Sequence, residues 1–123
     1  LLFARRGGQL LFGLPGNPLA HFVCLNLYVR AALEALAGRS GESVFQTGVL
    51  MAALPADGNA RETFWPAHWQ LRDGVATLTP LRWRSSGDLT SLASANALIR
   101  VTAGAQRLER SSWVEFVSTE MTL

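Results

Sequence analysis

The spacing of apolar residues changes at Gly38, and this change constrains most strongly what the chain can fold into. Residues 19–37 contain neither glycine nor proline and carry apolar side chains at helical spacing. Beyond the linker 39–43, short β-branched or aromatic runs alternate with turn residues, at 44–54, 61–71, 75–78, 97–101 and 113–117. We therefore predict an α/β strand–loop–helix fragment, residues 1–38, followed by a small all-β barrel-like domain, residues 44–123.

Two short strands, 1–5 and 9–12, are expected before the helix, joined by a glycine turn. The second is an apolar run typical of a buried parallel strand. The helix carries apolar side chains over more than one narrow stripe, which predicts that it is substantially buried against a sheet or a partner, and Gly38 supplies a left-handed stop. Such a piece needs neighbouring parallel strands to bury both faces of its sheet.

The segment 13–18, Gly-Leu-Pro-Gly-Asn-Pro, joins the second strand to this helix. Asn17 is a preferred helix N-cap, and Pro18 suits the first helical position, where its missing N–H costs nothing. Gly16 lacks a Cβ, so the backbone can bend or approach a ligand there. Free amides and the positive end of the helix dipole favour an anion at this edge, although similar junctions occur in many α/β proteins for structural reasons alone.

Composition and charge limit the classes of partner that we expect for this chain. A net charge of +2 in 123 residues gives little support for nucleic acid. The run Arg82-Trp83-Arg84 interleaves basic and aromatic side chains as single-strand-binding barrels do, but it stands alone in a nearly neutral chain. No uninterrupted apolar run approaches the ~18 residues of a membrane span. We expect neither nucleic acid nor a membrane as a partner, and the single Cys24 suits a reducing cytoplasm.

Common catalytic signatures are missing from this sequence. It has no Gly-x-Ser-x-Gly elbow, Walker loop or Gly-x-Gly-x-x-Gly run. His21 and Cys24 have helical spacing and could share a metal, but no second cysteine completes a tetrahedral set, so a packed thiol and imidazole are the plainer interpretation. The four tryptophans are interpreted as packing residues. We predict no catalytic residue and no metal site within this chain.

Gly-Leu-Pro-Gly-Asn-Pro followed by a long apolar helix resembles the signature of the molybdopterin molybdenumtransferase family, which includes MoeA and the C-terminal region of gephyrin. The likeness continues with Arg61 three residues before Phe64, and with a serine-rich segment, 85–94, that leads to Ala-Asn-Ala-Leu at 95–98. The strand 113–117 resembles the family's last strand. The resemblance covers nearly all of this chain but only the last part of the family's catalytic region.

The resemblance implies that the full protein binds adenylylated molybdopterin and molybdate, hydrolyses the adenylate bond with Mg²⁺, and releases molybdenum cofactor and AMP. Carried over by motif, the substrate-binding residues are Pro15, Gly16, Asn17, Pro18, Arg61 and Ser86. The first four would line the pocket floor, and the Arg61 guanidinium and the Ser86 hydroxyl would face the oxyanion. The family also implies a cytoplasmic homodimer with a shared site.

This sequence departs from the family pattern at two positions. Ala20 stands where a serine is frequent, and Pro66 where a second basic residue usually follows Arg61. Both changes remove polar groups from the expected anion site. The family's lysine-rich turn and its acidic Mg²⁺-binding segment precede the region that this chain resembles, so the fragment alone is expected to be inactive. The alternative is a non-catalytic relative or fragment that acts as a structural or dimerisation module.

Overall fold

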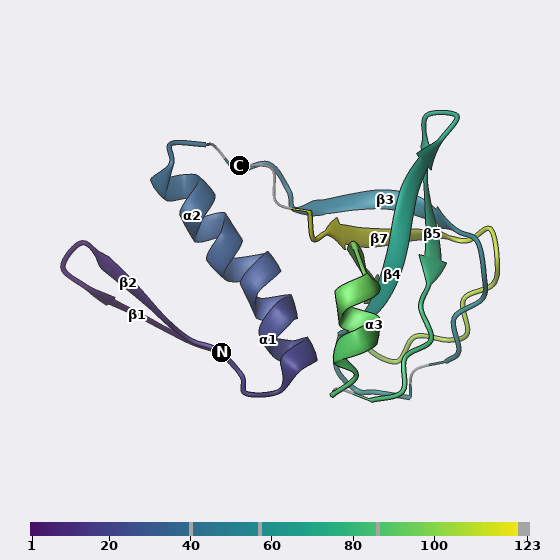
Figure 1. Cartoon of the computed structure of the whole chain (residues 1–123), viewed down its shortest axis with the longest axis horizontal. Helices are drawn as coiled ribbons and strands as arrows, with labels where there is room; N and C mark the ends of the chain where they lie inside the picture. The colour runs from purple at the N-terminus through teal and green to yellow at the C-terminus, as the bar shows by residue number, and fades with distance from the viewer. Residues whose placement is uncertain (40, 57, 86, 121–123) are drawn as a thin grey trace. The chain divides into compact units, whose positions relative to one another are not determined.

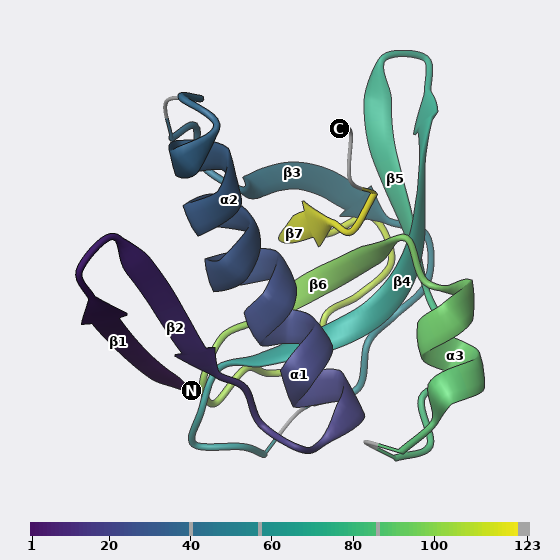
Figure 2. The same ribbon diagram turned by 60° about the vertical axis from the view of Figure 1, so that its left-hand side comes forward.

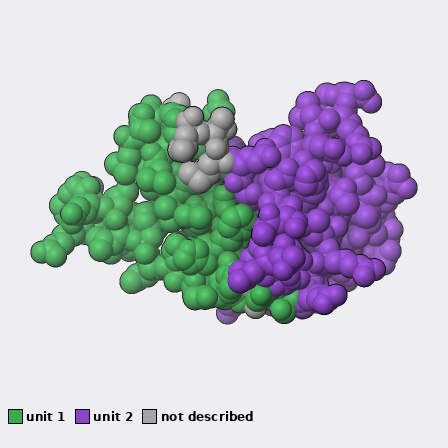
Figure 3. All heavy atoms as spheres, in the orientation of Figure 1, with its two compact units in different colours: residues 1–42, 85–87 green, residues 43–84, 88–123 purple. Residues whose placement is uncertain are grey.

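A computed structural model describes residues 1–39, 41–56, 58–85 and 87–120 of this chain. The chain divides into two compact units, which Figure 3 colours green and purple. Unit 1 consists of Leu1–Glu42 with Ser85–Gly87, and unit 2 of Ser43–Arg84 with Asp88–Leu123.

Unit 1 begins with an antiparallel hairpin of β1 (Leu2–Arg6) and β2 (Gln9–Gly13), visible in Figure 1. The Phe3 and Phe12 rings face each other across it, with centroids 5.1 Å apart. β2 pairs antiparallel with β1 and its residues are exposed or half-buried, and among the described residues no parallel strand lies beside it, so the parallel neighbours stay a prediction. A two-residue turn cannot make a parallel connection, which needs a crossover of a dozen or more residues.

The predicted helix is present as one continuous element, Pro18–Leu36. It comprises α1 (Pro18–Cys24), a π-helical turn η1 (Leu25–Val29) and α2 (Arg30–Leu36). At the π-helical turn the Arg30 amide donates to the Leu25 carbonyl, five residues back. The predicted stop is confirmed, because Gly38 has a φ of 74° and the Arg39 amide returns to the Glu34 carbonyl at 2.9 Å.

Burial of this helix against a sheet or a partner stays a prediction, because within the described residues the helix is mostly exposed or half-buried. Asn26 is the one buried residue among the described residues of unit 1, whereas Tyr28, Leu33 and Leu36 are exposed. One helix and one hairpin have too little surface to enclose each other's apolar faces. The helix is also long and apolar enough to cross a membrane by length and composition, a criterion that core helices of soluble proteins meet as well.

Unit 2 contains a closed barrel of five strands, as predicted (Figure 2). Their order around the barrel is β3 (Phe45–Leu50), β5 (Val75–Pro80), β4 (Thr63–Arg72), β6 (Ala97–Val101) and β7 (Trp113–Ser118). All neighbours pair antiparallel except β3 and β5, which run parallel. Closure leaves none of the five strands at an open edge.

The barrel interior is a single apolar core, formed by Leu50, Leu54, Ala67, Leu78, Ala97, Ile99, Val101, Val114 and Phe116. On β7, Val114 and Phe116 point into this core while Trp113 and Glu115 are exposed, and Val117 is also buried. The Trp69 ring packs against Phe116, with centroids 5.5 Å apart. Residues 113–116 of β7 therefore alternate between core and solvent, whereas β6 is buried on both of its sides.

Gly48 lies where β3 closes the barrel on β5. A Cβ at this position would lie 2.8 Å from Leu78 Cδ1 and 2.9 Å from the Ala76 carbonyl oxygen. Such contacts are too short for any side chain, so the parallel pairing of these strands depends on a glycine here.

Candidate functional site

The loop 15–18 has the helix-capping geometry that the sequence predicts. Asn17 is extended, with φ −70° and ψ 126°, and its Oδ1 accepts from the Ala20 amide at 3.2 Å, while Pro18 opens the helix. Since Pro18 has no amide hydrogen and the Ala20 amide is taken by the cap, Leu19 holds the remaining amide of the first three helical residues. The N-terminus of this helix therefore offers an anion fewer free backbone amides than the motif predicts.

Gly16 and Asn17 are exposed, and Pro15 and Pro18 are half-buried. A Cβ at Gly16 would meet no atom within 4 Å. The glycine therefore does not relieve a clash within this chain. It leaves an open stretch of backbone beside the cap, where a ligand can approach closely.

Arg61 is exposed on the segment that leads into β4 of unit 2, so it belongs to a different unit from the loop 15–18. The Asn59 carbonyl, two residues before it, accepts from the Gly104 amide at 2.9 Å. Among the described residues, no carboxylate pairs with the Arg61 guanidinium. Arg61 is therefore available to an external anion.

Ser86, the sixth predicted residue, lies outside the described residues. Just beyond it, Asp88 caps the short helix α3 (Leu89–Ser94), which the sequence analysis did not predict. The Asp88 carboxylate accepts from the Ser91 hydroxyl at 2.7 Å and from the Ser91 amide at 3.1 Å. These hydrogen bonds hold the pKa of Asp88 below its usual value. Ser91 Oγ also lies 2.9 Å from the Arg82 carbonyl oxygen, so the hydroxyl of this serine contacts both Arg82 and Asp88.

A groove of about 380 Å³ lies on unit 2 beside this segment. Its lining combines apolar residues with two arginines, and comprises Ala52, Ala53, Leu54, Pro55, Trp65, Pro80, Leu81, Arg82, Trp83 and Arg84. Trp65 Nε1 donates to the Leu81 carbonyl at 2.9 Å, which fixes one wall. The basic and aromatic run Arg82-Trp83-Arg84 noted in the sequence forms part of this lining.

A magnesium site does not fit the described residues. No three histidine, cysteine, aspartate or glutamate side chains gather within the part of the chain that the structure describes. Mg²⁺ requires carboxylates in near-octahedral geometry, often together with substrate phosphates. We therefore derive no step of a reaction through a metal held by this chain.

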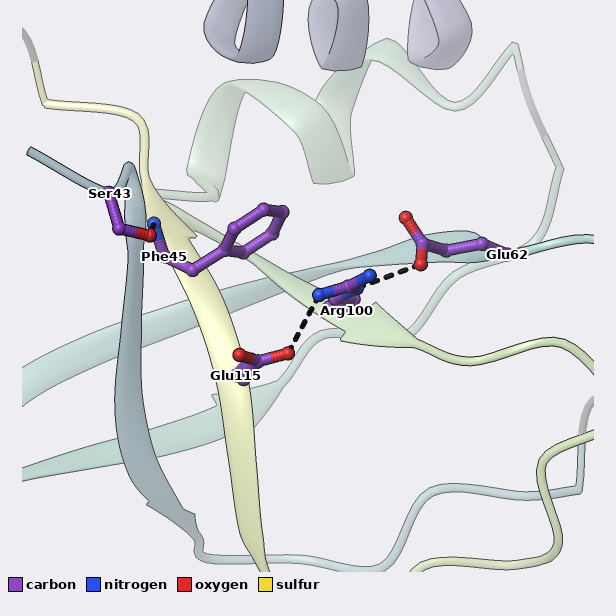
Figure 4. Close-up of polar contacts among 5 residues, drawn as sticks. All are labelled: Ser43, Phe45, Glu62, Arg100 and Glu115. Atoms are coloured by element: carbon purple, nitrogen blue, oxygen red, sulfur yellow. Dashed lines mark hydrogen bonds and ion pairs between the residues drawn. The ribbon is translucent and has the colours of Figure 1, made fainter. Parts of the chain in front are cut away.

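The sequence analysis missed a charged cluster around Arg100, shown in Figure 4. Arg100 Nε lies 2.8 Å from Glu62 Oε2, and Nη1 lies 2.9 Å from Glu115 Oε2. The guanidinium carbon is 4.8 Å from the centre of the Phe45 ring. The hydrogen bond to Glu62 is the main cause that raises the pKa of Arg100. Arg100 therefore binds two carboxylates, whereas Arg61 pairs with no carboxylate among the described residues.

Solved structures share this fold. A molybdopterin biosynthesis MoeA protein from Pyrococcus horikoshii superposes on 98% of this chain with a TM-score of 0.72 and 22% identity, and the match covers 29% of that protein. A molybdenum cofactor biosynthesis protein from Pyrococcus furiosus superposes on 84% of the chain, with a TM-score of 0.60, 28% identity and 36% of that protein covered.

Sequence comparison identifies the family. Residues 47–118 match the family model described as MoeA C-terminal region (domain IV). The match covers more than half of the chain, which therefore belongs to this family. Molybdopterin molybdenumtransferases from Staphylococcus aureus (strain Mu50) and Staphylococcus epidermidis (strain ATCC 12228) are each 30% identical over 116 residues. These alignments cover 92% of this chain and 27% of each relative, so the chain spans about a quarter of their length.

Proposed function

We propose that this chain is the C-terminal part of an enzyme of molybdenum cofactor biosynthesis, which inserts molybdate into adenylylated molybdopterin and releases AMP. The observation that carries the proposal is the family match over residues 47–118. Alignment of 92% of the chain with molybdopterin molybdenumtransferases supports it, because that alignment is longer than the barrel.

The division of the protein is part of this proposal. Residues 1–38 form the end of an α/β molybdopterin-binding-type domain, and residues 44–123 form the C-terminal barrel domain. Exposed apolar residues of the hairpin and the helix support the first assignment, among them Leu2, Phe3 and Leu33. Such residues are what a larger α/β domain buries against neighbouring strands.

The substrate-binding residues that we propose are the loop 15–18, which lines a pocket, and Arg61 and Ser86, which the barrel contributes to the pocket of the partner subunit. The open backbone at Gly16 and the Leu19 amide suit the approach of a phosphate, which helix N-termini bind well. Arg61 offers a planar fork that can contact two oxygens of a tetrahedral oxyanion. The ligands of the catalytic Mg²⁺ lie in other parts of the full-length enzyme, and the site is shared between two subunits of a cytoplasmic homodimer.

Replacing Arg61 in the full-length protein tests the site. Arg61→Lys is expected to weaken molybdate binding roughly ten- to hundredfold, because an ammonium cannot make the two-pronged contact. The melting temperature should stay unchanged, since exposed arginines contribute little to folding. Molybdate titration calorimetry and molybdate-dependent cofactor synthesis are the measurements. Arg107→Lys, at an exposed arginine paired with Glu109, is the matched control.

Unchanged binding and synthesis in Arg61→Lys would contradict the role of Arg61, and a large fall in melting temperature would make it a structural residue instead.

The second candidate is a non-catalytic relative that serves as a structural or dimerisation module. Pro66 favours it, because this proline is buried in β4 opposite Leu98 and offers no polar group where the family usually has a basic residue. Ala20 likewise offers only an amide, which the Asn17 cap occupies. The module predicts that the full-length protein binds no molybdate, whatever residue stands at position 61.

A further inference from the structure

Arg61 is presented on a short segment that is held on both sides. Two residues before it, the Asn59 carbonyl accepts from the Gly104 amide at 2.9 Å. One residue after it, the Glu62 carboxylate lies 2.8 Å from Arg100 Nε. Arg61 itself is exposed and bonded to no described carboxylate. The segment that carries Arg61 is therefore tied to the barrel on both sides of this residue, while no described carboxylate engages its side chain.

Arg100 is well suited to hold Glu62 because its guanidinium is constrained from three sides. It extends from β6, where it stands opposite Phe64 of β4, and it reaches Glu115 on β7 at 2.9 Å. The Phe45 ring of β3 lies against it, 4.8 Å from ring centre to guanidinium carbon. Figure 4 shows Arg100 between the two carboxylates. Charge-assisted hydrogen bonds on both sides fix the orientation of the fork.

The charge of Glu62 matters for its neighbour. A carboxylate one residue away from Arg61, if it had no partner, would compete with an incoming oxyanion for the guanidinium. Its negative charge would also repel a doubly charged anion such as molybdate. The pair with Arg100 weakens both effects, since it engages the carboxylate of Glu62 in a charge-assisted hydrogen bond and offsets part of its charge.

We infer that Arg100 is a positioning residue for anion binding: by holding Glu62, it keeps the guanidinium of Arg61 free for an oxyanion. The inference rests on the proposed function, because it assigns Arg61 to the anion site. Arg100 itself does not touch the anion, since both of its bonded faces are occupied by carboxylates.

The test is molybdate titration calorimetry on the full-length protein and on four variants. Arg100→Met keeps an unbranched apolar stem and removes both ion pairs, so molybdate affinity should fall about tenfold. Arg100→Met/Glu62→Gln should recover to within about threefold of the starting protein, because the released carboxylate is gone. Glu115→Gln leaves the Glu62 contact in place and should change affinity less than about twofold. Arg107→Met removes the same formal charge from an exposed pair and is the charge control.

Rescue by Glu62→Gln separates this role from a purely structural one. A general loss of barrel stability would lower the melting temperature of both Arg100 variants equally and would not be repaired by the second change. Affinity within twofold in Arg100→Met, or no rescue in the double variant, would overturn the inference. If Arg100→Met does not fold, Arg100→Lys serves, with a loss of about threefold expected from one retained point-charge contact.

Arg61→Ala keeps the two proposals distinguishable. Loss of molybdate binding in Arg61→Ala together with unchanged binding in Arg100→Met would overturn the inference and leave the proposed site standing. Unchanged binding in Arg61→Ala would overturn both, because the anion would then be bound elsewhere.

Discussion

The two compact units of this chain differ in how far they bury their apolar side chains. Unit 2 closes five strands into a barrel whose inner residues, such as Leu50, Ile99 and Phe116, are completely buried. In unit 1, Asn26 is the one buried residue among those described, while leucines and aromatic residues of the hairpin and helix are exposed. Both units are rich in apolar residues, so composition does not explain the difference.

The topology of the two units explains this difference in burial. Closure lets every inward side chain of the barrel face another, and it satisfies both edges of each strand. The hairpin of β1 and β2 has two open edges, and a single helix cannot cover both of its faces. Unit 2 is therefore stabilised by its own apolar core. The stability of the helix in unit 1 depends more on local interactions, such as the hydrogen bonds of its caps. Four changes would break or sharpen this comparison.

The largest expected effect is loss of a barrel core side chain. Phe116→Ala should destabilise the 123-residue chain by about 3–5 kcal/mol, because it leaves a cavity beside Trp69. Phe12→Ala, in the half-buried hairpin, should change the unfolding of this chain by less than about 1.5 kcal/mol. Urea denaturation measures both. Equal losses would mean that the two units share one core.

Gly48→Ala tests barrel closure. The added Cβ would meet Leu78 and the Ala76 carbonyl at under 3 Å, so a loss of about 1–3 kcal/mol is expected from overpacking. Gly58→Ala is the matched control, because a Cβ there meets nothing within 4 Å. Thermal unfolding of the two variants should differ clearly, and similar melting temperatures would show that β3 and β5 can separate at little cost.

Asn17→Ala tests how far unit 1 depends on its cap. Removing the acceptor for the Ala20 amide should cost about 1 kcal/mol of helix stability, whereas Asn17→Asp keeps the acceptor and should cost little. Amide hydrogen exchange across residues 18–24 is the measurement. Unchanged exchange in Asn17→Ala would mean that packing, rather than the cap, holds the start of the helix.

The smallest effect concerns the charged cap of α3 in unit 2. The pKa of Asp88 is lowered from its ordinary value of 3.8, chiefly by the Ser91 hydroxyl. The unfolded chain therefore binds this proton more readily than the folded one. The stabilisation is complete above the ordinary value and is lost as pH falls through the lower folded pKa. The stability difference between the starting protein and Asp88→Asn should be present at about pH 7 and shrink toward about pH 3 in urea titrations. A constant difference would contradict a charged cap.

Much of the fold follows from local patterns. Alternation predicted all five barrel strands, and helical spacing between a cap at Asn17 and a stop at Gly38 predicted the long helix. Helix α3 was missed because six residues are too short for a periodic signal, although Asp88 and Ser91 have the spacing of a cap. What covers the long helix does not follow from its sequence, because periodicity identifies an apolar face but not the surface that packs on it.

The sequence by itself determined the elements, the cap of the loop 15–18 and the motifs that resemble the family, since each depends on residues a few positions apart. Only the tertiary structure decided the parallel closure of β3 on β5 and the contacts of Arg100 with Glu62 and Glu115. Glu62 and Arg100 are 38 positions apart, and they meet because β4 and β6 pair in one register. A charged side chain on a strand has no periodic signal that identifies a distant partner, so the pairing of Arg100 with Glu62 and Glu115 depends on strand register.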